Sequence, residues 1–151
     1  MKPKRTDPVD EKLTIGPDGF GKVKLGMSVA EAYRTGQLDG PAPKKLDDCE
    51  LGVPLFRGGT IRAAVTLSPR IGVGTIVAYS NVFTPEGIAL GSTLDEVVAA
   101  YPGWDSLEIG DPDDHRQAVK VAGRKDTYYD IEVVDGEVVA LRLYLIETCY
   151  A

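Results

Sequence analysis

Two copies of one short motif constrain the fold of this chain more than any other feature. The first copy is Leu25-Gly26-Met27-Ser28 and the second is Leu90-Gly91-Ser92-Thr93, and the two align at a constant offset of 65 residues. Each copy combines the end of a short apolar run, a glycine at which the chain turns and the start of a predicted helix. The pattern indicates a tandem duplication.

Both copies carry the signature of a helix N-terminus. Ser28 is followed three residues later by Glu31, and Thr93 by Glu96. In such a capping box the hydroxyl accepts a hydrogen bond from the backbone of the third helical residue, and the glutamate returns one to the cap residue. We therefore expect two short helices, over residues 29–35 and 94–101.

Stretches in which apolar and polar residues alternate predict antiparallel strands. They cover residues 61–67, 73–79, 117–122, 128–134 and 137–146. The predicted fold class is α+β, a tandem duplication of a short helix packed on an antiparallel β-sheet. We expect residues 1–12 to form a flexible tail and residues 13–151 a single domain of two repeats, about 13–83 and 84–151.

The turn before the last strand decides which side chains share a face. Asp135-Gly136 is typical of a two-residue turn, but a three-residue loop that includes Val134, with Gly136 left-handed, makes one face uniformly apolar, and we predict that loop. The apolar face then consists of Tyr129, Ile131, Val133, Val139, Leu141, Leu143 and Leu145. The opposite face consists of Tyr128, Asp130, Glu132, Arg142 and Tyr144, with Tyr128 directly across from Arg142.

Charge and hydropathy argue against two classes of partner. The net charge of −6 argues against a general nucleic-acid binder, because such proteins carry a basic patch. No apolar stretch approaches the roughly 20 residues that a membrane-spanning helix needs. Residues 1–8 lack the apolar centre of a signal peptide, so if the natural protein is exported, we expect its leader to lie outside this sequence.

The two cysteines bear on the compartment. Cys49 follows two acidic residues, and Cys149 lies two residues before the last position. A disulfide is the simplest pairing, because a cysteine so close to the end of the chain is poorly placed for the core. The alternative is two unrelated buried thiols in a cytoplasmic protein.

The sequence offers no strong catalytic or cofactor motif. Asp111-Pro112-Asp113-Asp114-His115 is the densest group of metal-ligand types, but it lacks the glycine and the terminal glutamate of a calcium-binding loop. Asp47, Asp48 and Glu50 form a similar acidic group, for which solvation is the simpler explanation. His115 is the single histidine, and no serine lies in a nucleophile-elbow motif. We therefore predict no metal, no cofactor and, more readily than an enzyme, a binding protein.

The candidate binding residues are Tyr128, Arg142, Tyr144 and, at the start of another strand, Arg62. Tyrosine and arginine dominate the energetics of protein interfaces. The alternative is a cross-strand tyrosine–arginine pair that only covers the sheet. A rival hypothesis is a small enzyme or ligand carrier with a pocket between helices and sheet, in which Tyr33, Tyr79 or the carboxylate loops act.

The repeated motif also resembles an element of known families. Its Leu-Gly-Met-Ser-x-x-Glu-Ala and Leu-Gly-Ser-Thr-x-x-Glu-Val strings are similar to the element that begins a helix in the small outer-membrane-assembly lipoproteins and in the tandem-repeat β-lactamase inhibitory proteins. Duplicated, it resembles uncharacterised secreted or lipid-anchored proteins of high-GC Gram-positive bacteria. The resemblance implies an exported, non-enzymatic protein, either secreted or held to the cell envelope by a lipid anchor on its native N-terminus, that binds a protein partner. The inhibitory proteins carry a disulfide in each repeat, whereas this chain has one cysteine per half.

The cysteine pairing can be tested directly. We expect no free thiol in protein denatured without reductant and two after reduction, counted with a chromogenic thiol reagent. Because a Cys49–Cys149 bond would close a loop of about 100 residues, reduction should cost roughly 4–5 kcal/mol of unfolding free energy. Two free thiols in air-exposed material would contradict the disulfide and remove the argument for export.

Overall fold

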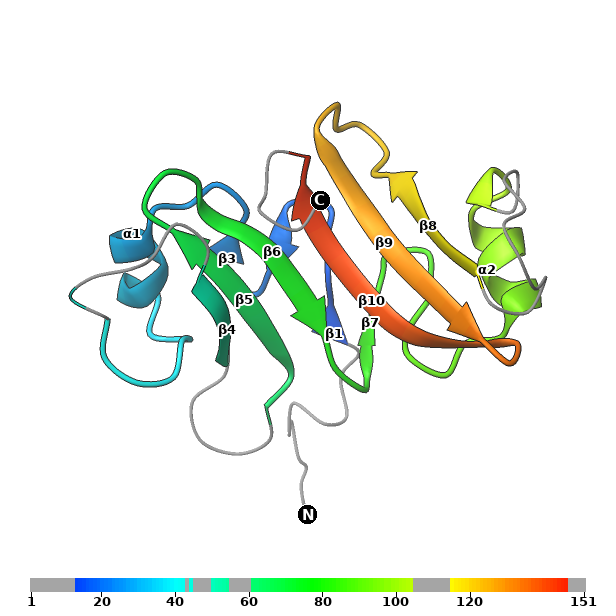
Figure 1. Cartoon of the computed structure of the whole chain (residues 1–151), viewed down its shortest axis with the longest axis horizontal. Coiled ribbons are helices and arrows are strands. Elements are labelled where there is room, and N and C mark those ends of the chain that lie inside the picture. The colour runs from blue at the N-terminus through cyan, green and yellow to red at the C-terminus, as the bar shows by residue number, and fades with distance from the viewer. Residues whose placement is uncertain (1–12, 43, 45–49, 55–60, 105–114, 147–151) are drawn as a thin grey trace, which may run out of the picture.

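The computed structural model describes residues 13–42, 44, 50–54, 61–104 and 115–146 (Figure 1). Its main element is a six-stranded antiparallel sheet with the strand order β4-β5-β6-β10-β9-β8. The strands are β4 (Glu50–Pro54), β5 (Ala63–Ser68), β6 (Gly72–Ala78), β8 (His115–Lys120), β9 (Thr127–Val134) and β10 (Glu137–Leu145). Three strands from each half of the chain therefore meet at the central pair, β6 and β10.

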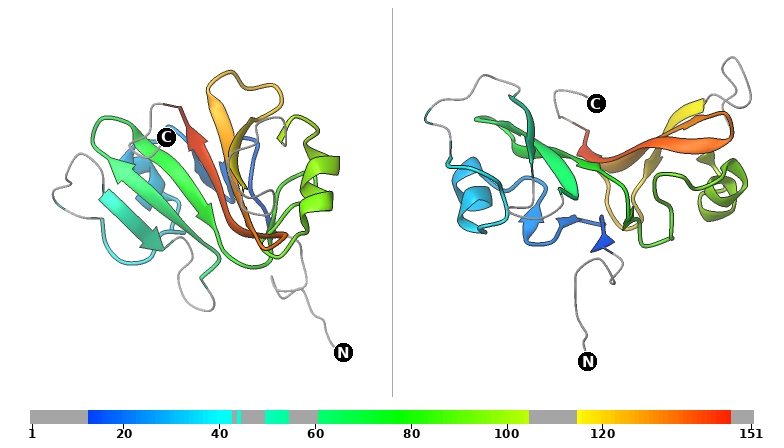
Figure 2. Two further views of the ribbon diagram at one scale, coloured as in Figure 1. Left: turned by 45° about the vertical axis from the view of Figure 1, so that its right-hand side comes forward. Right: turned by 90° about the horizontal axis from the view of Figure 1, so that it is seen from below.

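Short elements cover one face of this sheet. They are the helices α1 (Val29–Arg34) and α2 (Leu94–Ala100), the parallel pair β1 (Leu13–Thr14) and β7 (Val82–Phe83), and the antiparallel pair β2 (Gly19–Phe20) and β3 (Val23–Lys24). The right-hand view of Figure 2 shows both helices and β1 to β3 on the same side of the sheet. The core lies between these layers, and its largest fully buried side chains include Trp104, Tyr129, Ile76, Leu141 and Leu143.

The predicted α+β class is wrong. The residues that the structure describes are mostly β, with 42% strand and 13% helix, and one continuous sheet replaces a helix-on-sheet unit in each half. The helices contain only six and seven residues. Each helix ends one residue before its predicted end, and the class is wrong because strands such as β4 and β7 form where no strand was predicted.

Both capping boxes form. The Ser28 hydroxyl accepts a hydrogen bond from the Glu31 backbone N–H at 3.1 Å, and the Glu31 carboxylate accepts one from the Ser28 N–H at 3.1 Å. The corresponding Thr93 and Glu96 bonds measure 3.1 and 2.8 Å. The Ser28 backbone N–H, and then its hydroxyl, lower the pKa of the Glu31 carboxyl. These four residues stabilise the starts of the helices and are not placed at a ligand site.

The 65-residue offset recurs in the structure. Corresponding elements begin at Val29 and Leu94, at Glu50 and His115, and at Gly72 and Glu137. Backbone hydrogen bonds follow the same offset: Gly26 donates to Val73 (2.8 Å) and Val73 to Met27 (2.9 Å), while Gly91 donates to Val138 (2.9 Å) and Val138 to Ser92 (2.8 Å). In each half, these bonds attach the glycine turn before the helix to a central strand of the sheet, which is β6 in the first half and β10 in the second.

The β9–β10 turn differs from the predicted three-residue loop. Val134 pairs with Glu137, so the turn is the two-residue Asp135-Gly136, and both residues have positive φ, 53° and 79°. Such a turn matches the twist of a hairpin. The register shifts instead at a β-bulge between Val138 and Ala140, which leaves the side chain of Val139 half exposed and directs that of Val138 into the core.

The bulge also corrects the cross-strand partners on the polar face. Arg142 pairs with Asp130, and Tyr128 pairs with Tyr144. The predicted pairing of Tyr128 with Arg142 is wrong, because the actual partner of each lies two residues away from the predicted one. The residues expected on the polar face do share it. The extra residue that we predicted in the turn is instead placed at the bulge, so the strand beyond the bulge presents the same side chains to each face as predicted.

Gly72 provides a test of the contact between β6 and the turn before α1. An alanine Cβ at Gly72 would overlap the Met27 carbonyl oxygen, and φ there is +81°; at Gly123, φ is +80° but nothing lies within 4 Å. We expect Gly123→Ala to cost about 1–2 kcal/mol through backbone strain alone, and Gly72→Ala about 2 kcal/mol more. Urea unfolding of the two variants measures the difference. Equal losses would show that the Met27 contact does not constrain β6.

Candidate functional site

The face of the large sheet opposite the helices is the candidate site, and we call it the open face. Three rows of side chains cross it from β5 to β8. Strand pairing aligns Ala64, Val77, Arg142, Asp130 and Ala118 in the middle row, and Thr66, Thr75, Tyr144, Tyr128 and Lys120 in the next. In the third row Ala140, Glu132 and Arg116 are paired, and the Tyr79 N–H donates to the Arg62 carbonyl. Every second residue of a strand points to this face.

An ion-pair network occupies the middle of the open face. Asp130 Oδ2 accepts hydrogen bonds from Arg116 Nη2 and Arg142 Nη2, both at 2.7 Å, and Arg116 Nε lies 3.2 and 3.0 Å from the two carboxylate oxygens. The Asp130 side chain is 12% exposed, that of Arg142 26% and that of Arg116 53%. Asp130 therefore holds one half-exposed and one mostly buried guanidinium in fixed positions.

Two tyrosines lie beside this network. The rings of Tyr128 and Tyr144 stack, with centroids 5.8 Å apart and planes inclined by 23°. Burial raises the pKa of Tyr144, and the charge of Asp130 raises it further. The hydroxyl of Tyr144 therefore stays protonated at neutral pH and presents a hydrogen-bond donor. The pKa of Arg116 is raised chiefly by its hydrogen bonds to Asp130.

The charge of the open face is opposite to that of the whole chain. In the three rows described above, four cationic side chains stand against two anionic ones: Arg62, Arg116, Lys120 and Arg142 against Asp130 and Glu132. The chain as a whole has a net charge of −6. This face is therefore a basic and aromatic surface on an acidic protein.

The structure brings together three of the four predicted binding residues. Tyr128, Arg142 and Tyr144 are neighbours on β9 and β10, whereas Arg62 lies two strands away, beyond β6. Arg116 was not among the predicted binding residues, because the predicted strand began at Gln117 and left this arginine in a loop. Arg116, Ala118 and Lys120 follow one another at intervals of two residues. This spacing, which is typical of one face of a strand, begins one residue before the predicted start of the strand.

Other predicted residues lie outside the described part of the chain. These are Cys49 and Cys149, the acidic residues Asp47, Asp48 and Asp111 to Asp114, and the side chains of Glu50 and His115. Within the described residues, no group of three or more metal-ligating side chains is placed to hold an ion. Because both cysteines lie outside the described residues, the Cys49–Cys149 disulfide stays a prediction.

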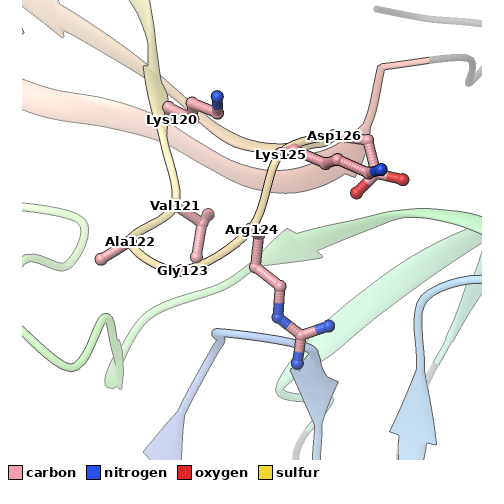
Figure 3. A pocket seen from close by; sticks show the side chains of 7 residues that line it. All are labelled: Lys120, Val121, Ala122, Gly123, Arg124, Lys125 and Asp126. Carbon is pink, nitrogen blue, oxygen red and sulfur yellow. The ribbon is translucent and has the colours of Figure 1, made fainter.

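Three of the cavities along the surface bear on the search for a ligand site. The largest of these three, about 740 Å³, is the concave side of the β8–β9 loop, and its lining is one continuous stretch, Lys120 to Asp126 (Figure 3). Arg124 turns out of this loop toward Asp18, with Nη2 3.5 Å from Oδ2. A cavity of about 320 Å³ lies nearby at Arg70 and Ile146, and another of about 350 Å³ lies beside Tyr101. Neither Tyr33 nor Tyr79 lines any of the three.

Comparisons with known proteins do not assign this chain to a family. No protein-family model, no curated protein and no solved structure matches the chain. In the described residues, neither helix has the length or apolar character needed to cross a bilayer. The chemistry of the open face therefore has to support any functional assignment on its own.

The ion-pair network predicts an asymmetric response to loss of charge. Asp130→Asn should cost about 2 kcal/mol of unfolding free energy, because Arg142 loses its counter-ion and its Nε has no hydrogen-bond partner among the described residues. Glu132→Gln, one row away on the same strand, should change stability by less than about 0.5 kcal/mol. Thermal or urea unfolding checks both. Equal small effects would show that Asp130 does not hold the arginines.

Proposed function

We propose that this protein is a non-catalytic binding module that recognises an acidic surface of a protein partner through its open face. The observation that supports this most directly is the stacked Tyr128–Tyr144 pair next to the two arginines held by Asp130. Buried tyrosines and arginines contribute most of the binding energy in many protein interfaces. Because Asp130 already fixes both guanidinium groups, binding would immobilise fewer side chains.

The charge of the surface supports an acidic partner. Four cations against two anions favour a surface that carries carboxylates, and complementary charge raises association rates and excludes partners of like charge. Arg116 and Lys120 are the exposed cations of the group. Binding should therefore weaken as salt concentration rises.

The size of the open face sets a limit on the interaction. Ala64, Thr66 and Thr75 at the β5–β6 end are buried, so the accessible part is mainly that on β8 to β10. Three strands spaced by about 4.8 Å span roughly 10 Å, and three rows span roughly 13 Å, which gives about 130 Å². A standard interface buries about 800 Å² per partner. The partner must therefore also contact neighbouring loops, or bind transiently.

The proposed setting is the cell envelope or the extracellular space. This proposal rests on the resemblance of the repeated motif to exported lipoproteins and inhibitory proteins, and on the predicted Cys49–Cys149 bond. A small enzyme or ligand carrier is the second candidate, and the 350 Å³ cavity beside Tyr101 is the observation that favours it.

A photo-crosslinking amino acid tests the proposed interface. Placed at Ala118, which is exposed on the open face, it should crosslink to one protein in cells that express the chain naturally; at Ala99, exposed on α2, it should not. With that protein purified, Arg116→Glu and Tyr144→Ala should each reduce affinity at least tenfold, or about 1.4 kcal/mol, by calorimetry. Crosslinking from Ala99 alone, or unchanged affinity in both variants, would contradict the proposal.

A further inference from the structure

The cavity beside Tyr101 is built by segments that are far apart in the sequence. It lies on the helical side of the sheet, since Tyr129, which lines it, faces the core. Its apolar walls come from the β1–β2 loop, the segment after β7, the last residue of α2 and the end of β8: Pro17, Pro85, Ala100 and Val121. Its volume of about 350 Å³ lies in the range of small-molecule sites.

A directed hydrogen-bond chain leads into this cavity. The Tyr101 hydroxyl lies 2.8 Å from Thr84 Oγ1 and 2.7 Å from Glu86 Oε1, and Thr84 Oγ1 accepts a bond from the Ile88 N–H at 3.1 Å. Tyr101 has one proton, and the carboxylate is the acceptor that cannot donate. Tyr101 therefore donates to Glu86 and accepts from the Thr84 hydroxyl. Burial raises the pKa of Tyr101, so this donor stays protonated.

Glu86 is left with capacity to bind a donor. A carboxylate accepts about four hydrogen bonds, and in the described structure Glu86 receives one, from Tyr101. It is the only acidic side chain among the residues that the structure places around the cavity. A ligand group that satisfies it must donate protons, and a positive charge would strengthen the bond.

The aromatic walls suit the same ligand. The rings of Tyr101 and Tyr129 have centroids 6.1 Å apart and are tilted by 43°. Tyr129 is fixed, because its hydroxyl donates to the Ile15 carbonyl at 2.8 Å and a Cβ at Gly16 would overlap that hydroxyl. Both tyrosines line the cavity but are almost fully buried, with 8% and 2% of their surface exposed, so they offer the ligand a rigid aromatic wall.

The cationic residue at the rim does not oppose such a ligand. Lys120 lines the cavity, but its cross-strand partner is Tyr128 on the open face, so alternation sends its amine to the other side of the sheet.

We propose that this cavity binds a small organic cation, with an ammonium group at Glu86 and an apolar body against the two tyrosines and two prolines. The site is separate from the open face, since Tyr129 and Tyr128 point to opposite sides of β9. A protein partner and this ligand could therefore be bound together.

Amide NMR titration with n-butylammonium tests the site, and tetramethylammonium, which has no N–H to donate to Glu86, should bind more weakly. We expect saturable shifts of the Glu86, Tyr101 and Ala122 amides, and none with butyrate or n-butanol at the same concentrations. Glu86→Gln should weaken binding about tenfold, because the charge is removed while the shape is kept. Ala100→Leu should abolish binding by filling the cavity with a residue that favours helix.

Asp95→Asn is the matched control, because it removes an exposed carboxylate from the first turn of α2, away from the cavity. It should bind both cations as the unmodified chain does. Equal binding of butyrate or n-butanol, cation shifts confined to the open face, or an unaltered Glu86→Gln affinity would overturn the proposal. Unfolding curves of each variant establish that a loss of binding is not a loss of fold, since Glu86 is exposed and its substitution should leave stability unchanged.

Discussion

The antiparallel pairing of β6 with β10 is the contact on which the rest of the structure depends. Without it, each half would be a three-stranded sheet with two exposed edges, close to the limit of independent stability. The pairing places Ile76 opposite Leu143 in the core and Val77 opposite Arg142 on the open face. The same backbone contact therefore joins the two core halves and brings Arg142 and Tyr144 to the middle of the candidate interface.

Local chemistry made parts of the fold predictable. Each capping box depends on two residues three positions apart, so its formation could be predicted from Ser28 and Glu31 without knowing the rest of the molecule. The β9–β10 register was not local in this sense. The bulge at Val139 depends on the requirement that Val138 and Leu141 both reach the core, and sequence alternation alone placed the adjustment in the turn instead.

The candidate site, like the fold, was only partly predictable from local sequence. Alternation alone put Tyr128, Arg142 and Tyr144 on one face, but the partner of Asp130 depends on how β8 aligns with β9, which no short motif encodes. The cavity beside Tyr101 was still less accessible, because Pro17, Glu86 and Val121 meet there only through the packing of separate segments. Residues that are adjacent through long-range packing leave no periodic signal in a sequence.

The repeat offset and the central register together define a pseudo-twofold axis. Val77 and Arg142 are cross-strand partners, and they are also separated by the 65 residues that relate the two halves. In a symmetric dimer of identical halves, the residue at this position would face its own copy. An arginine there would meet an arginine, and like charges opposite each other destabilise a sheet, whereas valine tolerates itself. Because the two halves of this chain are not identical, a valine and an arginine can face each other across the pseudo-twofold axis. A single guanidinium therefore lies beside this axis at the centre of the sheet.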